Sequence, residues 1–241
     1  MRYGIISDIH GNREALDVAV RYLESVGVDT FICVGDIVGY GADPTQCLDT
    51  VKGLTDAVVA GNHDHAAVGR SDIENFNQHA KMAVLWTSEQ LSGENKDYLG
   101  SLPMMLQLDD ALIVHSTPFQ PEKWYYLLTH FQFVAAFQQF TERICFIGHS
   151  HQPVVFEKGK QHTGPLQGAT FSLSDGSRYI INVGSVGQPR DNDPRLSCCI
   201  YDSSAMTVEL IRLEYDVTLA QDKIRKAGLP EYLAQRLAHG E

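Results

Sequence analysis

Residues 3–10 read Tyr3-Gly-Ile-Ile-Ser-Asp-Ile-His10, an apolar run that ends in a short polar motif. The same arrangement returns at residues 31–34, 57–60, 111–114 and 144–147, where apolar, mostly β-branched runs each precede another polar cluster. Such runs are typical of buried strands, so the polar side chains follow the points where strands end. Because the ends of neighbouring strands converge, we expect the polar clusters to form one site.

The polar clusters contain nitrogen and oxygen donors of the kinds that bind metal ions. In chain order they are Asp8-Ile-His10, Gly35-Asp36, Gly61-Asn-His-Asp64, His115 and Gly148-His-Ser-His151. A single aspartate after a strand is more often a helix cap or turn former. However, five of the ten histidines fall within these motifs. A purely structural role would need five separate coincidences, so we interpret the set as a metal site.

This ordered series, which spans residues 8–151, resembles the motifs of the calcineurin-like metallophosphoesterases. Two further stretches, Val38-Gly-Tyr-Gly41 and Gly184-Ser-Val-Gly-Gln-Pro-Arg-Asp191, resemble a bacterial branch of that family. The branch includes small phosphodiesterases and symmetrical dinucleotide-polyphosphate hydrolases. The sequence departs from the branch at Val183, where proline is expected before Gly184-Ser185.

The resemblance implies an α/β fold in which two packed mixed β-sheets are flanked by helices, a four-layer α/β/β/α sandwich. It also implies two divalent ions that share Asp36 and are bound by Asp8, His10, Asp36 and His151 on one side and by Asp36, Asn62, His115 and His149 on the other. Mixed imidazole and carboxylate shells suit Mn, Fe, Zn or Co. A hydroxide that bridges the ions is the expected nucleophile on phosphorus.

Two residues beside the ligands have expected catalytic roles. His63 matches the family's proton donor, and we expect it to point at the substrate and to protonate the leaving oxygen. Asp64 is expected to accept a hydrogen bond from the His63 imidazole and so to orient it.

Substrate contacts are expected from three further residues, each with a structural alternative. Arg190 either grips a phosphate with its guanidinium or pairs with Asp191 or Asp193. Tyr40 and the aromatic cluster at 124–126, with Trp124 as the best candidate, either stack on a nucleobase or belong to the core. Of the histidines outside the motifs, only His65 is close enough in sequence to be a candidate.

Composition limits the class of protein. The 241 residues carry a formal charge of −11, which argues against a broad surface for duplex nucleic acid or an anionic membrane. The five cysteines form no C-x-x-C pair, and Cys33 and Cys145 lie in apolar strand runs, where we expect reduced, buried thiols. Because the first strand begins without an apolar leader and no apolar run approaches membrane-span length, we expect a cytoplasmic protein.

The organisation along the chain predicts one metallophosphoesterase domain over residues 1–241. Helices are expected from Asn12 to Gly27, from Pro44 to Gly53, and at 217–227 and 230–239. Segments 72–101 and 121–142 are rich in helix formers, and we expect part of them to cap the site. From residue 153 onward, alternating strand runs predict a second, largely antiparallel sheet packed on the first.

The leading function is a dinuclear metal-dependent phosphoesterase that hydrolyses a small phosphodiester, nucleotide or dinucleotide polyphosphate. The alternatives are a protein or phosphomonoester phosphatase and a non-catalytic scaffold of the same fold, for which missing ligands would be expected. A DNA nuclease is disfavoured by the acidic charge and the lack of a basic stripe. Metal identity, physiological substrate and oligomeric state stay open.

Overall fold

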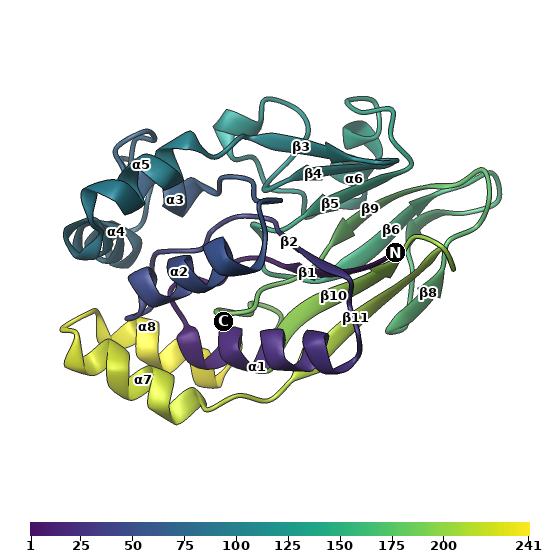
Figure 1. Ribbon diagram of the computed structural model, residues 1–241. Helices are drawn as coiled ribbons and strands as arrows, with labels where there is room; N and C mark the ends of the chain where they lie inside the picture. The colour runs from purple at the N-terminus through teal and green to yellow at the C-terminus, as the bar shows by residue number, and fades with distance from the viewer.

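The computed structural model describes residues 1–241, and two β-sheets form the middle of the molecule with helices on their outer sides (Figure 1). This is the α/β fold class expected from the sequence, with the four layers in the order helix, sheet, sheet, helix. Helices α1 and α7 lie below the sheets in the view, and helix α6 lies above them.

The first sheet combines strands from the two ends of the chain in the order β2-β1-β10-β11-β8. Its strands are β1 (Arg2–Ile6), β2 (Thr30–Cys33), β8 (Thr170–Ser172), β10 (Leu196–Asp202) and β11 (Thr207–Leu213). Strand β1 is an interior strand and pairs in parallel with β2 and antiparallel with β10.

The second sheet has the order β3-β4-β5-β9-β6-β7. Its strands are β3 (Met105–Leu108), β4 (Ala111–Val114), β5 (Ile144–Ile147), β6 (Val154–Lys158), β7 (Thr163–Pro165) and β9 (Arg178–Asn182). The neighbours β4, β5 and β9 run parallel to one another, so their carboxyl ends lie at one edge.

Two strand predictions are wrong in detail. The strands after residue 153 do not form a sheet of their own, since β6 and β9 extend the sheet of β4 and β5, whereas β10 and β11 extend the sheet of β1. The run at 57–60 is not a strand but a single parallel bridge between Cys33 and Val58. Val59 N donates to Cys33 O, whereas Ala60 N, which points to the opposite side of the run, donates to Pro103 O.

Alternating side chains on the strands build the layers. In β1, Ile5 packs between the two sheets, while Ile6 packs on the outer side with α1. In β5, Phe146 faces the same inter-sheet core, and Cys145 faces the core beneath α6. Each sheet is therefore buried on both faces, which explains why the strand runs are continuously apolar rather than alternating. All five cysteines are free and buried, and for Cys33 and Cys145 this was predicted.

The helices begin and end largely where the sequence predicts. Asn12 caps α1 (Arg13–Ser25) by accepting from Ala15 N at 3.1 Å, and α2 (Pro44–Leu54) begins with its proline. The other helices are α3 (Asn62–Ala67), α4 (Gln78–Gln90), α5 (Gly93–Ser101), α6 (His130–Ala136), α7 (Val217–Lys226) and α8 (Glu231–Gln235), with 3₁₀ turns η1 (Pro121–Lys123) and η2 (Arg236–Ala238).

Segment 121–142 is less helical than predicted. After η1, Trp124 adopts a left-handed backbone with φ 55°, which stops the helix. The chain then runs without regular structure until Thr129, whose side chain accepts from Gln132 N and caps α6. This non-helical stretch carries aromatic side chains past the ends of β4 and β5.

The departure at Val183 has a structural reason. Val183 N donates to Ile147 O at 3.0 Å and prolongs the pairing of β5 with β9. Proline has no backbone N–H and would lose this bond. The valine therefore keeps the sheet paired up to the residue before Gly184.

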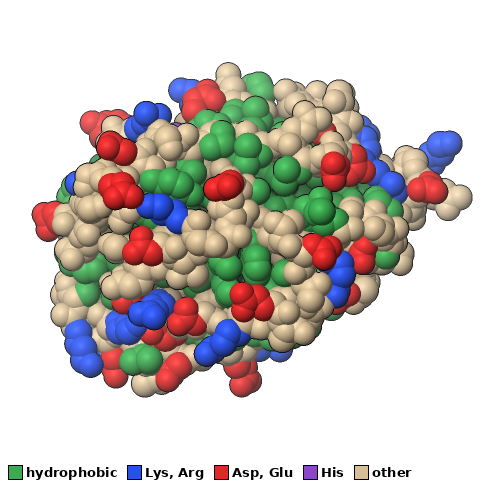
Figure 2. All heavy atoms as spheres, in the orientation of Figure 1, with side chains coloured by type: hydrophobic (Ala, Val, Ile, Leu, Met, Phe, Trp, Pro, Cys, Tyr) green, Lys and Arg blue, Asp and Glu red, His purple; other side chains and the backbone are tan.

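On the face that Figure 2 shows, acidic and basic side chains are scattered among hydrophobic ones, and the basic ones form no continuous stripe. No helix in the structure has both the length and the apolar character needed to span a membrane.

Candidate metal centre

Strand ends bring the predicted ligands together from distant parts of the chain. Asp8 and His10 follow β1, Asp36 follows β2, His115 follows β4, and the two histidines of 148–151 follow β5. Asn62 is the first residue of α3. The two parallel pairs, β1 with β2 and β4 with β5, end at the same side of the sandwich, which places six of the seven predicted ligands in one region. Asn62, the seventh, lies between Gly61 and His63, which both adjoin Asp36.

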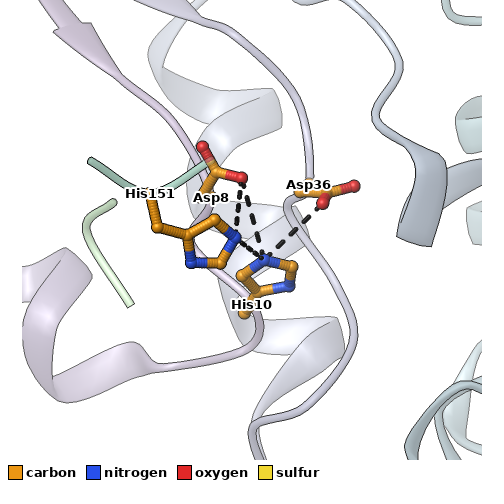
Figure 3. A group of neighbouring side chains, drawn as sticks. All are labelled: Asp8, His10, Asp36 and His151. Atoms are coloured by element: carbon orange, nitrogen blue, oxygen red, sulfur yellow. Dashed lines mark hydrogen bonds and ion pairs between the residues drawn. The ribbon is translucent and has the colours of Figure 1, made fainter. Parts of the chain in front are cut away.

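The first group consists of Asp8, His10, Asp36 and His151, which point toward one another in Figure 3. His151 Nε2 lies 3.2 Å from Asp8 Oδ1, and His10 Nε2 lies 3.6 Å from Asp36 Oδ2. The four side chains are buried. This is the grouping that the family resemblance implies for one ion.

The second group consists of Asp36, His115 and His149. His115 Nε2 lies 3.3 Å from Asp36 Oδ2, the same oxygen that faces His10. Asn62 Oδ1 is buried without a hydrogen-bond partner, as expected for an oxygen that awaits another ligand. Asp36 belongs to both groups, so its carboxylate occupies the bridging position.

The orientation of the imidazoles shows that the residues fit metal ions. Nδ1 of His10, His115 and His151 lies within 3.2 Å of the backbone oxygens of Val38, Val34 and Gln188, respectively. Nδ1 must carry the proton to donate to a carbonyl, which leaves the lone pair of each Nε2 directed into the site. Nε2 of His10 and Nε2 of His151 then face each other at 3.2 Å, an arrangement of two lone pairs that a cation stabilises.

The charges of the side chains also favour added positive charge. Burial lowers the pKa of His149 to about 3. Burial acts in the same direction on His115, but the Asp36 carboxylate outweighs it and raises the His115 pKa to about 9. Burial opposes ionisation of Asp8, yet His151 and His115 hold the pKa of that carboxyl below its usual range. The carboxylates thus remain anionic and favour the protonated form of His115.

The backbone of the site is unusual, since five predicted ligands lie in the left-handed region. Their φ angles lie between 49° and 66°, and the residues are Asp8, His10, Asp36, His149 and His151. Non-glycine residues rarely adopt this conformation, and such residues cluster at functional sites. Gly61 and Gly148 have a different constraint: an added Cβ would collide with Asp36 at the first and with Ser7 and Asp8 at the second.

The loop at 184–191 holds the ligands in place. Ser185 Oγ donates to Asp8 O at 2.8 Å, and Gly187 N donates to the same oxygen at 2.9 Å. Gln188 O accepts from His151. The sequence motif that resembles the bacterial branch therefore acts, at least in part, by positioning Asp8 and His151.

His63 lies inside the site, but Asp64 does not orient it. His63 N donates to Asp36 Oδ1 at 2.8 Å, and His63 Nδ1 has no partner. Asp64 accepts instead from the backbone N–H groups of Ile37, Val38 and Gly61. The predicted hydrogen bond from His63 to Asp64 is wrong, because three backbone donors occupy the carboxylate. Asp64 fixes the Asp36 loop, and burial raises its pKa to about 7.

Arg190 is not paired with an acid, which excludes the salt-bridge alternative. Asp191 pairs with Arg212, and Asp193 pairs with Arg195. The Arg190 guanidinium contacts Gln188 Oε1 at 2.8 Å and lies over the Tyr40 ring. Burial is the largest cause that lowers the pKa of His151, and the positive charge of Arg190 is the next largest. Arg190 thus supplies a cation at the edge of the site.

All three aromatic and imidazole candidates make contacts within the protein. Tyr40 is buried between His10 and His63, with ring centroids at 4.7 and 4.4 Å, so the prediction that it stacks on a base is wrong. Trp124 O accepts from His149 Nε2 at 2.9 Å, and its indole N–H donates to Ser71 Oγ. His65 meets the Trp124 ring edge-on. Contact of Trp124 with substrate stays a prediction.

Sequence reasoning missed one aromatic neighbour of the site, Phe76, and favoured Trp124 over Tyr126 in the cluster at 124–126. The Tyr126 ring stacks on the His149 ring with centroids 4.0 Å apart, and the Phe76 ring lies 4.9 Å from the His63 ring. Both lie in the segments predicted as a cap, and Trp124 in the second segment donates to Ser71, which directly precedes the first. The aromatic composition of 119–126 was the available signal, but it does not tell which ring reaches a ligand.

Comparisons with known proteins agree with this geometry. The model of the calcineurin-like phosphoesterase superfamily domain matches residues 1–206. An uncharacterized protein of Methanocaldococcus jannaschii is 37% identical, over 98% of this chain and 97% of its own length. The crystal structure of a metallophosphoesterase from Sphaerobacter thermophilus is 39% identical with a TM-score of 0.89, over 100% of this chain and 99% of its own.

A hypothetical protein from Pyrococcus horikoshii has the same fold, with a TM-score of 0.82 and 21% identity over 100% of this chain and 98% of its own. The family model and the relatives that match the whole length lead to one conclusion: this chain belongs to the calcineurin-like phosphoesterase superfamily.

Proposed function

We propose that this protein is a dinuclear metal-dependent phosphoesterase that hydrolyses a small phosphodiester, nucleotide or dinucleotide polyphosphate. The observation that carries the proposal is the set of imidazole nitrogens and carboxylate oxygens that face one another across Asp36. The donor set fits Mn, Fe, Zn or Co. When bound, a pair of such cations lowers the pKa of water and offsets the charge of a phosphoryl group.

Residues of the chain supply the remaining functions of the site. Asp36 is shared by the two groups of ligands. Asn62 contributes its unpaired oxygen to the group that contains His115. His63 is placed to give a proton to the leaving oxygen. Burial lowers its pKa to about 4, so it is neutral before substrate binds; an anionic phosphate beside it favours the protonated form.

Arg190 orients the substrate. Its guanidinium has no acid partner, and Gln188 holds it through a neutral hydrogen bond. A planar guanidinium can bind two phosphate oxygens at once, so we propose that Arg190 binds two non-bridging oxygens of the substrate phosphate. A small phosphorylated substrate also agrees with a face that lacks a basic stripe, and we propose a cytoplasmic protein that binds neither duplex nucleic acid nor membrane.

A panel of substrates tests the proposed function directly. Purified protein loaded with Mn²⁺ is expected to hydrolyse phosphodiesters and dinucleotide polyphosphates faster than phosphomonoesters or a phosphopeptide. Release of phosphate mainly from monoesters or phosphopeptides would favour the phosphatase alternative. No turnover of any substrate, with both metal sites filled, would favour a scaffold, although every ligand expected of a catalytic member is present.

Arg190→Ala is expected to raise KM for an anionic diester about 10–100-fold, because a hydrogen bond to a charged group contributes about 1.5–3 kcal/mol. Arg190→Lys should restore little of this loss, since an ammonium lacks the planar pair of donors. Steady-state kinetics of both variants measure the effect. Arg195→Ala, which breaks only the surface pair with Asp193, is the matched control; an equal loss in that variant would contradict the assignment.

A further inference from the structure

A cavity of about 560 Å³ lies beside the metal centre, within the range of about 300–1,000 Å³ for small-molecule pockets. It is lined by Thr117, Phe119, Tyr125, Tyr126, Leu127, Gln132, Ala135, Ala136 and Gln139. None of these side chains is charged. The cavity therefore suits the neutral part of a molecule, while the phosphate stays with the metal ligands and Arg190.

The cavity adjoins the half of the centre that contains His115 and His149. Thr117 lies two residues after His115, and Tyr126 stacks on His149. Tyr126 thus forms part of the cavity wall and at the same time covers a predicted ligand. A molecule held there has one end next to the site of phosphoryl chemistry.

The walls of the cavity are aromatic and exposed. Phe119, Tyr125 and Tyr126 are 46%, 49% and 45% exposed. The rings of Phe119 and Tyr125 are nearly parallel, at 13° with centroids 6.4 Å apart. Three open aromatic rings around one cavity favour a planar aromatic occupant, because bases and aromatic rings stack face to face.

The polar groups of the cavity favour a heteroaromatic ring over a hydrocarbon. Gln132 Oε1 accepts from Leu128 N and Thr129 N, so its oxygen is committed to the start of α6. Gln139 lines the cavity and is exposed, so its amide is free to pair with a base edge. We infer that this cavity, defined here as the aromatic pocket, binds the nucleobase of the substrate, an inference that rests on the proposed function.

The test compares two ligands that differ only in the base, adenosine 5′-monophosphate and ribose 5-phosphate. Binding to the Mn²⁺-loaded protein is measured by calorimetry, which needs no turnover. Adenosine 5′-monophosphate should bind more tightly, and Phe119→Ala or Tyr125→Ala should weaken it about tenfold, since stacking contributes about 1–3 kcal/mol per base. Ribose 5-phosphate should bind equally well to all these variants.

A substitution that fills the pocket gives an independent test. Ala135 is exposed on α6 and lines the pocket, so Ala135→Trp should also weaken adenosine 5′-monophosphate about tenfold without removing a contact. Phe131→Ala is the matched control, because Phe131 is 79% exposed on the same helix and does not line the pocket.

The outcomes separate this inference from the proposed function. Equal affinity for the two ligands, with diesters still hydrolysed, would overturn the pocket assignment alone. A preference for the base in a protein without hydrolytic activity would support the pocket and contradict the proposed function. A loss of self-association in Phe119→Ala, measured by light scattering, with unchanged nucleotide binding would instead identify an interface between copies and overturn the inference.

Discussion

Asp36→Asn is expected to lower kcat/KM for a phosphodiester at least about 1,000-fold while the protein stays folded. Asp36 Oδ2 lies 3.6 Å from His10 Nε2 and 3.3 Å from His115 Nε2, closer to both than Asp8 Oδ1 does, so Asp36 is the carboxylate best placed to offset the charge of two ions. Loss of several kcal/mol of charge stabilisation corresponds to such a factor, since about 1.4 kcal/mol changes a rate tenfold. The amide keeps an oxygen that can accept from His63 N.

Metal analysis shows whether the loss has the stated cause. The unaltered protein should contain two ions, and Asp36→Asn should retain one or none at an unchanged melting temperature. Asp49→Asn, on the exposed side of α2, is the control and should match the unaltered protein. A crystal soaked in Mn²⁺ that showed no anomalous signal beside Asp36 would reject the dinuclear centre.

His63→Ala is expected to slow the hydrolysis of esters with poor leaving groups about 10²–10⁴-fold, the usual contribution of general acid catalysis. Esters of an activated nitrophenol should lose far less, because their leaving oxygen needs little protonation. The His63 imidazole fits this role because its Nδ1 is free and its ring lies beside His10 without being among the grouped ligands.

The comparison requires that both metals remain bound in the variant. Stoichiometry is measured before kinetics, and His162→Ala, in an exposed loop, serves as the control for loss of an imidazole. A plot of log kcat against the pKa of the leaving group should become steeper in His63→Ala. Equal losses for all leaving groups would show that His63 positions the substrate or Asp36 rather than donating a proton.

The ligands could be predicted because their signals are local. A continuous apolar run marks a strand buried on both faces, and a histidine or aspartate directly after it marks the strand end. Asp8, Asp36, His115 and His151 all occupy such positions, and the structure brings them together. The cap of α1 at Asn12 has the same local character, since its partner is only three residues away.

The errors arise where a partner is distant in sequence. An apolar run indicates a strand but not the sheet to which the strand belongs. The placement of β6 and β9 in one sheet and of β10 and β11 in the other was therefore not predictable. The Asp64 carboxylate could accept a hydrogen bond from His63, but it accepts instead from backbone N–H groups of the Asp36 loop. The aromatic pocket combines residues 117–127 with one face of α6, which no single stretch of sequence indicates.

The interior place of β1 in its sheet has a consequence for the order in which the site forms during synthesis. Asp8 leaves the ribosome early, yet the loop at 184–191 and β10, which hold the Asp8 segment on its other side, are made late in the chain. At about 5–20 residues per second, roughly 10–40 s separate the synthesis of Asp8 from that of β10. Such long-range pairing is also slow to form. A nascent chain therefore exposes separate predicted ligands rather than a site, and we expect the site to assemble only after β10 has been made.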